Sequence, residues 1–359
     1  MIIVEETMNP DFFSLKISEI RPEINGKATS VTFDLPTSLA ETFCWQAGQH
    51  VTLRFHLNEK EQRRSYTISN PPGALLRITV KRVAGGLVSN HIGDHLKPGD
   101  TVDVMPPFGQ FSLTPDPLKR RTHYFFGAGS GITPLFAMIN SVLEKEPHSV
   151  AHLIYGNADG ESIIFGEELD ILKTDHVVRF TLRHVLSAPS LWSWSSSWRK
   201  GRVDADAIKA AVKETPPVAQ DVHYWICGPG AMNADVSNAL MALDVPASRI
   251  HMESFGGATV TASSVTGIAA NAQVELGGAT HEVPVAVDQT LLNAILSAGL
   301  TPPFSCQSGV CGACKARLTK GQVHMHARMA LEDSDVTRGD ILTCQSIATS
   351  DKLSISFDN

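Results

Sequence analysis

Four of the chain's six cysteines lie close to its C-terminal end, and their spacing narrows the possible folds sharply. They follow the pattern C-x4-C-x2-C, then 29 residues, then a last cysteine. These four are Cys306, Cys311, Cys314 and Cys344. The spacing is that of the thiolate ligands of a plant-type 2Fe–2S cluster. Gly309 and Gly312 lie between the cysteines, where glycine lets the backbone wrap closely around a cluster.

A zinc site and a set of disulfides both fit the clustered cysteines less well. A structural zinc site with four cysteines usually has two C-x2-C pairs, and this chain has one such pair and a distant single cysteine. Disulfides require an oxidising compartment, and the N-terminal stretch MIIVEETMNPDFF does not have the pattern of a secretory signal. His324 and His326 follow the third cysteine, and we predict that they are surface residues because four cysteines complete the ligand set.

Composition excludes several classes of protein. The chain has 359 residues, 43% of them hydrophobic and 19% charged, which is typical of two or three globular domains. Its formal net charge of −7 argues against non-specific nucleic-acid binding. No run approaches the ~20 apolar residues of a membrane-spanning helix. We therefore expect a cytoplasmic protein without a membrane or nucleic-acid partner.

The residues around the cysteines have the pattern of a small mixed α and β domain. Two alternating segments flank Gly277 and Gly278, which predicts a hairpin. TLLNAILSAGL has apolar residues at helical spacing and closes with Gly299, and DKLSISFDN predicts a final strand. Residues 271–359 resemble the plant-type ferredoxins on these features and the cysteine pattern.

Two motifs in the N-terminal part are candidates for binding a flat, phosphate-bearing ligand. In the predicted strand RRSYTISNPPG, Arg64 and Tyr66 share one face, so a ring could stack on a heterocycle while the guanidinium pairs with phosphate. In KRVAGGLVSNHI, Ser89 lies near the start of a predicted helix, whose N–H groups bind anions. An exposed arginine beside a packed tyrosine, and an ordinary glycine turn with a serine cap, are the alternatives.

Two glycine-rich strand ends follow further along the chain. The strand Tyr124–Phe126 leads into GAGSGITP, and we predict an amphipathic helix after Pro134. A second buried strand ends at Cys227 and leads through Gly228 and Pro229 into another helix. Such strand–glycine–helix units bind pyrophosphate at the carboxyl edge of a parallel sheet, although GAGSGITP is not the standard G-x-G-x-x-G.

The order R-x-Y-T, GG-x-x-S, GSGITP, CGPGAM and the cysteines resembles the ferredoxin–NADP⁺ reductase superfamily, and within it the reductase components of oxygenases. The reductases of phenylacetyl-CoA epoxidase and of 3-ketosteroid hydroxylase are the family types most similar to it. The resemblance implies an antiparallel β-barrel flavin domain, an α/β doubly wound nucleotide domain and an α+β (β-grasp) ferredoxin domain. The implied ranges are an FAD-binding barrel at 11–115, an NAD(P)H-binding domain at 116–256, a linker at 257–270 and the ferredoxin domain at 271–359.

The resemblance also implies a role for each motif residue. Around FAD, Arg64 would pair with the pyrophosphate, Tyr66 would stack on the isoalloxazine and Thr67 would bond near its N5. The phosphates would be held by Gly86, Val88 and Ser89. The nicotinamide nucleotide would be met by Gly127, Gly129, Gly131 and Thr133. Next to the nicotinamide ring would lie Cys227, Gly228 and Pro229. Phe255 would cover the other face of the flavin.

Three departures from the family pattern affect the prediction. Ala47 replaces a usual proline before Gly-Gln, which loosens a turn. Ala158 stands where many relatives have an arginine that could meet a 2′-phosphate, and this favours NADH over NADPH. An insertion carries Trp192, Trp194 and Trp198, for which we weigh a locally packed surface loop against a docking edge or a lid.

The resemblance implies an oxidoreductase that passes electrons from NAD(P)H through FAD and a 2Fe–2S cluster to a terminal oxygenase. Two alternatives are a reductase of soluble acceptors and a redox-sensing iron–sulfur protein. The small, polar stretch after Phe255 predicts a flexible linker on which the ferredoxin domain moves.

Overall fold

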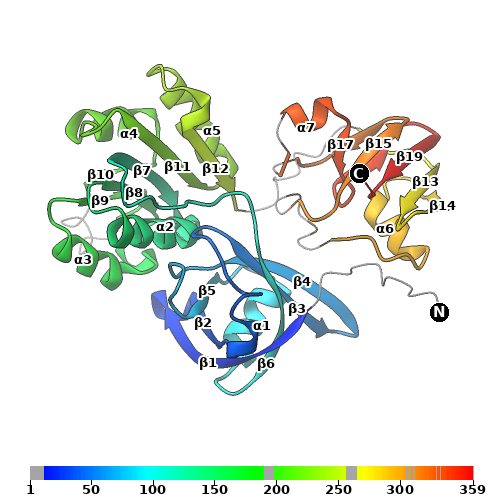
Figure 1. Ribbon diagram of the computed structural model, residues 1–359, viewed down its shortest axis with the longest axis horizontal. Coiled ribbons are helices and arrows are strands. Elements are labelled where there is room, and N and C mark those ends of the chain that lie inside the picture. Colours follow the sequence, from blue (N-terminus) through cyan, green and yellow to red (C-terminus); the bar gives the residue numbers. More distant parts are fainter. Residues whose placement is uncertain are drawn as a thin grey trace. The chain divides into compact units, whose positions relative to one another are not determined.

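The structure is a computed structural model that describes residues 12–189, 198–255 and 265–358, apart from 305, 306, 308, 310, 311, 329 and 332 (Figure 1). Contacts divide the chain into two compact units. One contains Phe13–Gln62 and Tyr66–Phe255, and holds a barrel and a nucleotide-type domain. The other contains the C-terminal domain, from Gly256 onward.

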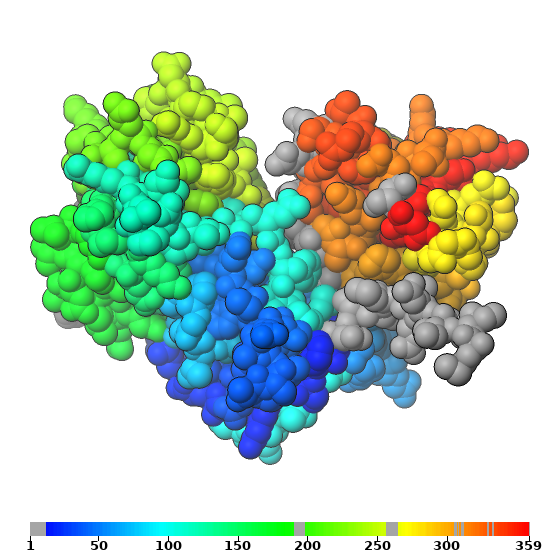
Figure 2. All heavy atoms as spheres, viewed as in Figure 1, coloured from blue at the N-terminus to red at the C-terminus, as the bar shows by residue number. Residues whose placement is uncertain are grey.

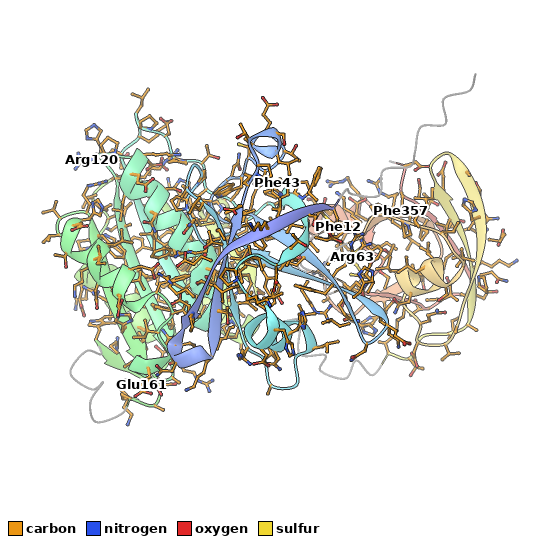
Figure 3. The ribbon with its side chains drawn as sticks, turned by 90° about the horizontal axis from the view of Figure 1, so that it is seen from below. Phe12, Phe43, Arg63, Arg120, Glu161 and Phe357 are labelled. Carbon is orange, nitrogen blue, oxygen red and sulfur yellow. The ribbon has the colours of Figure 1, made fainter. Side chains whose placement is uncertain are left out.

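The first domain is a six-stranded antiparallel barrel. Its elements are β1 (Phe13–Glu23), β2 (Ala28–Asp34), β3 (His50–Leu57), β4 (Lys60–Thr67), β5 (Leu76–Lys81), α1 (Leu87–His95) and β6 (Thr101–Phe108). The strands run in the order β4-β3-β6-β1-β2-β5, and a bridge between Ile68 and Ile78 joins the two edge strands. Phe43, labelled in Figure 3, is fully buried in the hydrophobic core of this barrel. Closing the sheet leaves few exposed strand edges.

The second domain is a parallel sheet covered by helices on both faces. Its elements are β7 (Arg121–Ala128), η3 (Gly129–Gly131), α2 (Ile132–Lys145), β8 (Val150–Asn157), α3 (Gly166–Asp175), β9 (Phe180–Leu186), β10 (Arg199–Lys200), α4 (Ala205–Glu214), β11 (Asp221–Gly228), α5 (Gly230–Met241) and β12 (Ile250–Ser254). The order is β10-β9-β8-β7-β11-β12, with all neighbours parallel. Alternate residues of β7 pack on opposite faces, Phe125 with α2 and α3 and Tyr124 with α4 and α5. This is the doubly wound arrangement that the resemblance implied. In Figure 2 the yellow-green spheres of α5 form part of its surface.

A shared carboxylate ties the barrel to the nucleotide-type domain. Glu168 Oε1 on α3 accepts hydrogen bonds from Arg21 Nη2 on β1 at 2.9 Å and from Arg77 Nη1 on β5 at 2.8 Å. The Arg77 guanidinium also lies 5.0 Å from the centroid of the Phe165 ring. These contacts fix the side of the barrel that faces α3.

The C-terminal domain is a five-stranded sheet with a short helix against it. Its elements are β13 (Ala270–Leu276), β14 (Ala279–Val285), α6 (Leu291–Ser297), β15 (Lys315–Lys320), β16 (Val323–Met325), α7 (Asp333–Thr337), β17 (Asp340–Leu342), β18 (Ser346–Ala348) and β19 (Lys352–Ser356). The order is β14-β13-β19-β15-β17, with β13 and β19 parallel. The predicted hairpin, helix and final strand are therefore confirmed, and Gly299 has the positive φ of a helix end.

One boundary prediction is wrong. We expected the helix of the glycine loop to follow Pro134, but α2 begins at Ile132 and contains the proline in its first turn. The first N–H groups of a helix have no partner within it, so the missing N–H of proline costs no hydrogen bond there.

The tryptophan insertion is described only at its end. Trp192 and Trp194 lie outside the described residues. Trp198 Nε1 donates to Glu214 Oε2 at 3.2 Å, and its ring lies beneath the Arg183 guanidinium, 4.8 Å from centroid to Cζ. This tryptophan therefore packs locally against the nucleotide-type domain. In the parts of the chain that the structure describes, no helix is both long and apolar enough to cross a bilayer.

Candidate functional site

A cavity of about 720 Å³ opens at the carboxyl edge of the parallel sheet. Its walls come from the ends of β7, β8 and β11 and from the segments that follow them. Of the predicted nucleotide residues, Gly129, Gly228 and Pro229 line it, and so does Phe255, which was predicted to cover a face of the flavin. The volume and position suit a dinucleotide, which binds outside the carboxyl ends of strands in this fold.

Close backbone packing forms the floor of this cavity. A Cβ on Gly131 would lie 2.0 Å from the Cys227 carbonyl oxygen and 3.0 Å from the Gly228 nitrogen. A Cβ on Gly127 would lie 2.9 Å from a methyl of Leu135. Gly131 thus lets the loop after β7 pack against the end of β11, and Gly127 leaves room for Leu135 on α2.

Thr133 and Tyr155 hold the glycine loop from below. Thr133 is buried, and its hydroxyl donates to the Ser130 carbonyl at 3.1 Å. Tyr155 Oη donates to the Gly129 carbonyl at 2.8 Å. Thr133 does not line the cavity, so the structure gives it a loop-supporting position rather than a place facing a nucleotide.

Cys227 and Glu253 lie opposite each other where β11 and β12 end. Burial raises the pKa of the Cys227 thiol well above its usual value, and the nearby Glu253 raises it further. Burial also raises the pKa of Glu253 to about 8. The raised pKa keeps the Cys227 thiol protonated, and a buried thiol of this kind is not a nucleophile. Asn233 Nδ2 donates to the Glu253 carbonyl at 2.8 Å and holds this strand end in place.

The predicted flavin motif lies on β4. Arg64 is exposed, Tyr66 is half-buried against the barrel core, and Thr67 is buried. Arg64 Nη1 donates to the Arg63 carbonyl at 2.7 Å, so its guanidinium lies along its own strand. Solvent exposure therefore decreases along this strand from Arg64 to Thr67.

The second flavin motif forms the start of α1, as predicted. Gly85 has a φ of +69°, and a Cβ on Gly86 would lie 2.6 Å from Ser89 Oγ. Ser89 Oγ accepts a hydrogen bond from the Val83 N–H at 3.2 Å, and the Val88 side chain packs in the barrel core. The first helical hydrogen bond begins at the Asn90 N–H. The Gly86 N–H donates to the Val83 carbonyl at 2.9 Å, whereas the N–H groups of the first helical turn have no partner within the helix and can bind a phosphate.

The cysteine loop is described in part. Cys306 and Cys311 lie outside the described residues. Cys314 and Cys344 are both buried in one cluster with Leu292, Phe304 and Leu342. The Cys314 carbonyl accepts from Thr343 N–H at 3.1 Å and from Thr343 Oγ1 at 3.0 Å. Two buried thiols on neighbouring, tightly bonded segments fit the soft donor set of an iron–sulfur cluster.

Gln345 is a residue of this loop that sequence reasoning missed. Its Nε2 lies 3.6 Å from Cys344 Sγ as a donor and also donates to the Gln307 carbonyl at 3.0 Å. Donors to the sulfurs of a cluster tune its potential. The only sequence signal was its position next to the fourth cysteine. The cavity residues Lys81, Arg202 and Asp235 were also missed, because the motif patterns assign no role to their positions.

Comparison with known proteins agrees with this architecture. Models of three domain families match the chain: an oxidoreductase FAD-binding domain at 16–113, an oxidoreductase NAD-binding domain at 125–238 and a 2Fe-2S iron-sulfur cluster binding domain at 274–349. The fold is similar to that of phthalate dioxygenase reductase, with a TM-score of 0.63, 23% identity and coverage of 96% of this chain and 98% of that one. The chain is thus an oxidoreductase that binds FAD, NAD(P)H and a 2Fe–2S cluster.

Two relatives identify the family within this class. A subunit of 1,2-phenylacetyl-CoA epoxidase from Escherichia coli is 32% identical over 353 residues, which are 97% of this chain and 98% of that protein. The ferredoxin reductase component of 3-ketosteroid-9-alpha-monooxygenase from Rhodococcus rhodochrous is 33% identical over 343 residues, or 91% and 92%. The chain belongs to the family of reductase components of oxygenases.

Proposed function

We propose that this chain takes electrons from NAD(P)H and delivers them, through FAD and the cluster, to a partner oxygenase. The observation that carries the proposal is the joining, in one chain, of a dinucleotide-sized cavity, a barrel of the flavin-binding type and a buried thiol pair. No described residue set in the cavity resembles a hydrolytic or group-transfer site. Such a chain handles electrons and leaves substrate oxidation to another protein.

The barrel residues would hold the flavin. FAD supplies the conversion between a two-electron donor and one-electron acceptors when it is bound. Arg64 would pair with its pyrophosphate, Tyr66 would stack on the isoalloxazine, and Thr67 would bond near N5. Val88 and Ser89 would meet the phosphates through backbone N–H groups at the start of α1, and Gly86 would let them approach because it has no side chain. The half-buried position of Tyr66 against the barrel core supports stacking, because part of its side chain is left accessible to a ligand.

The cavity residues would bind and orient the nucleotide. Gly129, Gly228 and Pro229 would approach it with backbone alone, and Gly127 and Gly131 would keep the two strand ends close. Phe255, which also lines the cavity, would cover the other face of the flavin. The Cys227 thiol, whose pKa is raised by burial, would place no negative charge beside the nicotinamide ring.

Cys306, Cys311, Cys314 and Cys344 would ligate the cluster. Residues 271–359 would form the ferredoxin domain, and 257–270 would be the linker that lets it move. We place the activity in the cytoplasm, because the described cysteines Cys44 and Cys227 form no disulfide and a reducing compartment suits a thiolate-ligated cluster.

Two serine variants separate the steps of this path. Cys344→Ser removes one cluster ligand, whereas Cys44→Ser changes an exposed barrel cysteine and serves as the matched control. We expect Cys344→Ser to lose the electron paramagnetic resonance signal of the reduced cluster and the reduction of cytochrome c, while NAD(P)H still bleaches its flavin. Cys44→Ser should behave as the unaltered chain. Full cytochrome c reduction by a Cys344→Ser protein without a cluster signal would refute the proposed path.

A further inference from the structure

The nucleotide cavity has two ends of different chemistry, and this inference rests on the function proposed above. Lys81, at the end of β5, has its Nζ 3.4 Å from where a Cβ of Gly129 would lie. Gly129 begins the glycine loop after β7, which is where a doubly wound sheet receives pyrophosphate. Lys81, which belongs to the barrel, therefore places a positive charge at the pyrophosphate end of the cavity.

The other end lies over β8 and β9, two strands that follow β7 in the sheet. It is lined by Asn157 and Ala158 at the end of β8, by Ser187 after β9 and by Arg202 after β10. In this fold a residue near the end of the second strand binds the adenosine ribose. A carboxylate there binds the 2′-hydroxyl of NAD, and an arginine binds the 2′-phosphate of NADP. Among the described residues lining the cavity, the end of β8 supplies no carboxylate.

Arg202 is held at this end by the backbone on both of its sides. Gly201 has a φ of +127°, and its N–H donates to the Leu186 carbonyl at 2.9 Å. Val203 is buried, and a Cβ on Gly156 would lie 2.9 Å from its methyl group. These contacts hold the backbone of the turn between the ends of β8 and β9. The backbone of Arg202 is therefore held at the cavity wall, and its side chain is exposed.

The carboxylate nearest in sequence is already engaged. Asp204 also lines the cavity, but its Oδ1 accepts from the Ala207 N–H at 2.9 Å as the N-cap of α4. Asp235 lines the cavity from α5, whose strand, β11, lies on the far side of β7 from β8. Arg202 is therefore the cationic side chain at this end among the described residues that line the cavity, and Asp204 is oriented by its N-cap hydrogen bond to α4.

We propose that Arg202 is the specificity-determining residue for the adenosine 2′-phosphate, so that the chain accepts NADPH in preference to NADH. The arginine missing at position 158 is replaced, in this view, by one that reaches the same end of the cavity from the turn after β10. A guanidinium binds phosphate through paired N–H donors, which a ribose hydroxyl cannot match.

The test is equilibrium binding of NADP⁺ and NAD⁺ to the flavin-loaded full-length protein by isothermal titration calorimetry, without turnover. Arg202→Ala removes the proposed contact. Arg199→Ala is the matched control, because this arginine lies three residues earlier, donates to the Asp206 carbonyl at 3.0 Å and does not line the cavity. Lys81→Ala removes the cation at the other end.

We expect the unaltered protein to bind NADP⁺ more tightly than NAD⁺. Arg202→Ala should weaken NADP⁺ binding about tenfold or more, the range of one charge-assisted contact, and change NAD⁺ binding less than twofold. Arg199→Ala should change neither, and Lys81→Ala should weaken both alike. The NADP⁺ preference should shrink with added salt only where Arg202 is present.

Two results with Arg202→Ala would overturn the inference. Equal weakening of both nucleotides would mean that the guanidinium contacts a part they share, such as the adenine or the pyrophosphate. No change in either would mean that Arg202 does not reach the ligand. Failure of the unaltered protein to bind either nucleotide would instead refute the proposed function, which keeps the two failures distinct.

Discussion

Replacing Gly131 with alanine tests how closely the glycine loop must approach β11. A Cβ at this position would lie 2.0 Å from the carbonyl oxygen of Cys227. Real Cβ atoms essentially never come within 3.0 Å of another heavy atom, so the clash requires a movement of about an ångström. The obstructing atom belongs to the backbone of a central strand and cannot rotate away as a side chain would.

The expected cost follows from that rigidity. Overpacking a dense interior typically destabilises a protein by about 1–3 kcal/mol. For a domain of this size each kcal/mol lowers the melting temperature by roughly 2–4 °C. The displaced loop should also withdraw Gly129 from the cavity, because the two glycines belong to one short η3 turn. Nucleotide affinity should therefore fall more steeply than stability alone explains.

The assay pairs thermal unfolding with NADP⁺ binding, and Gly230→Ala is the matched control. Gly230 is exposed at the first position of α5, and a Cβ there meets nothing within 4 Å. Alanine should be neutral or slightly stabilising at that helical position. Equal melting temperatures and equal affinities for the two variants would refute the reasoning about close backbone approach.

Three further outcomes are expected. Glu168→Ala should lower the free energy of unfolding by about 1–3 kcal/mol, because Arg21 and Arg77 lose the carboxylate that they share. Urea unfolding measures this, with Glu168→Gln for comparison. An unchanged urea midpoint would contradict the expectation. Burial lowers the pKa of His50, His152 and His251 to about 4, so they stay neutral when folded and bind protons near pH 6.5 when unfolded. Stability should therefore fall as pH drops from about 6.5 to about 4, by up to about 1.4 kcal/mol per pH unit for each histidine, and a flat urea midpoint across that window would count against it. Gly309→Ala, with a φ of +78° and a clash at 2.9 Å, should reduce iron content after purification, whereas retention of two irons per chain would contradict the close wrapping of the cysteine loop.

Sequence patterns predicted the parts of the fold in which nearby residues determine the backbone conformation. The glycine loops, the hairpin at Gly277 and the last strand all lie where their residues favour one backbone conformation. The start of α2 was misplaced because proline is a stop signal in a helix interior but is tolerated in the first turn.

The site was predictable to the extent that its residues sit in motifs. Gly129 and Gly228 were found because strand–glycine–helix units converge at one sheet edge, and Phe255 was implied by the family resemblance. Lys81 and Arg202 were not, because they reach the cavity from the barrel and from an unmarked turn that only the assembled sheet brings near the glycine loop. Spacing along a chain does not encode such long-range neighbours.

The most direct test of the proposed electron path is an anaerobic titration of the full-length, cofactor-loaded protein with NADPH and, separately, with NADH. Absorption would follow the flavin, and electron paramagnetic resonance would follow the cluster. The account predicts that the flavin bands bleach and that the signal of a reduced 2Fe–2S cluster appears in the same titration, with NADPH effective at the lower concentration. Bleaching of the flavin with no cluster signal at any nucleotide concentration would contradict it.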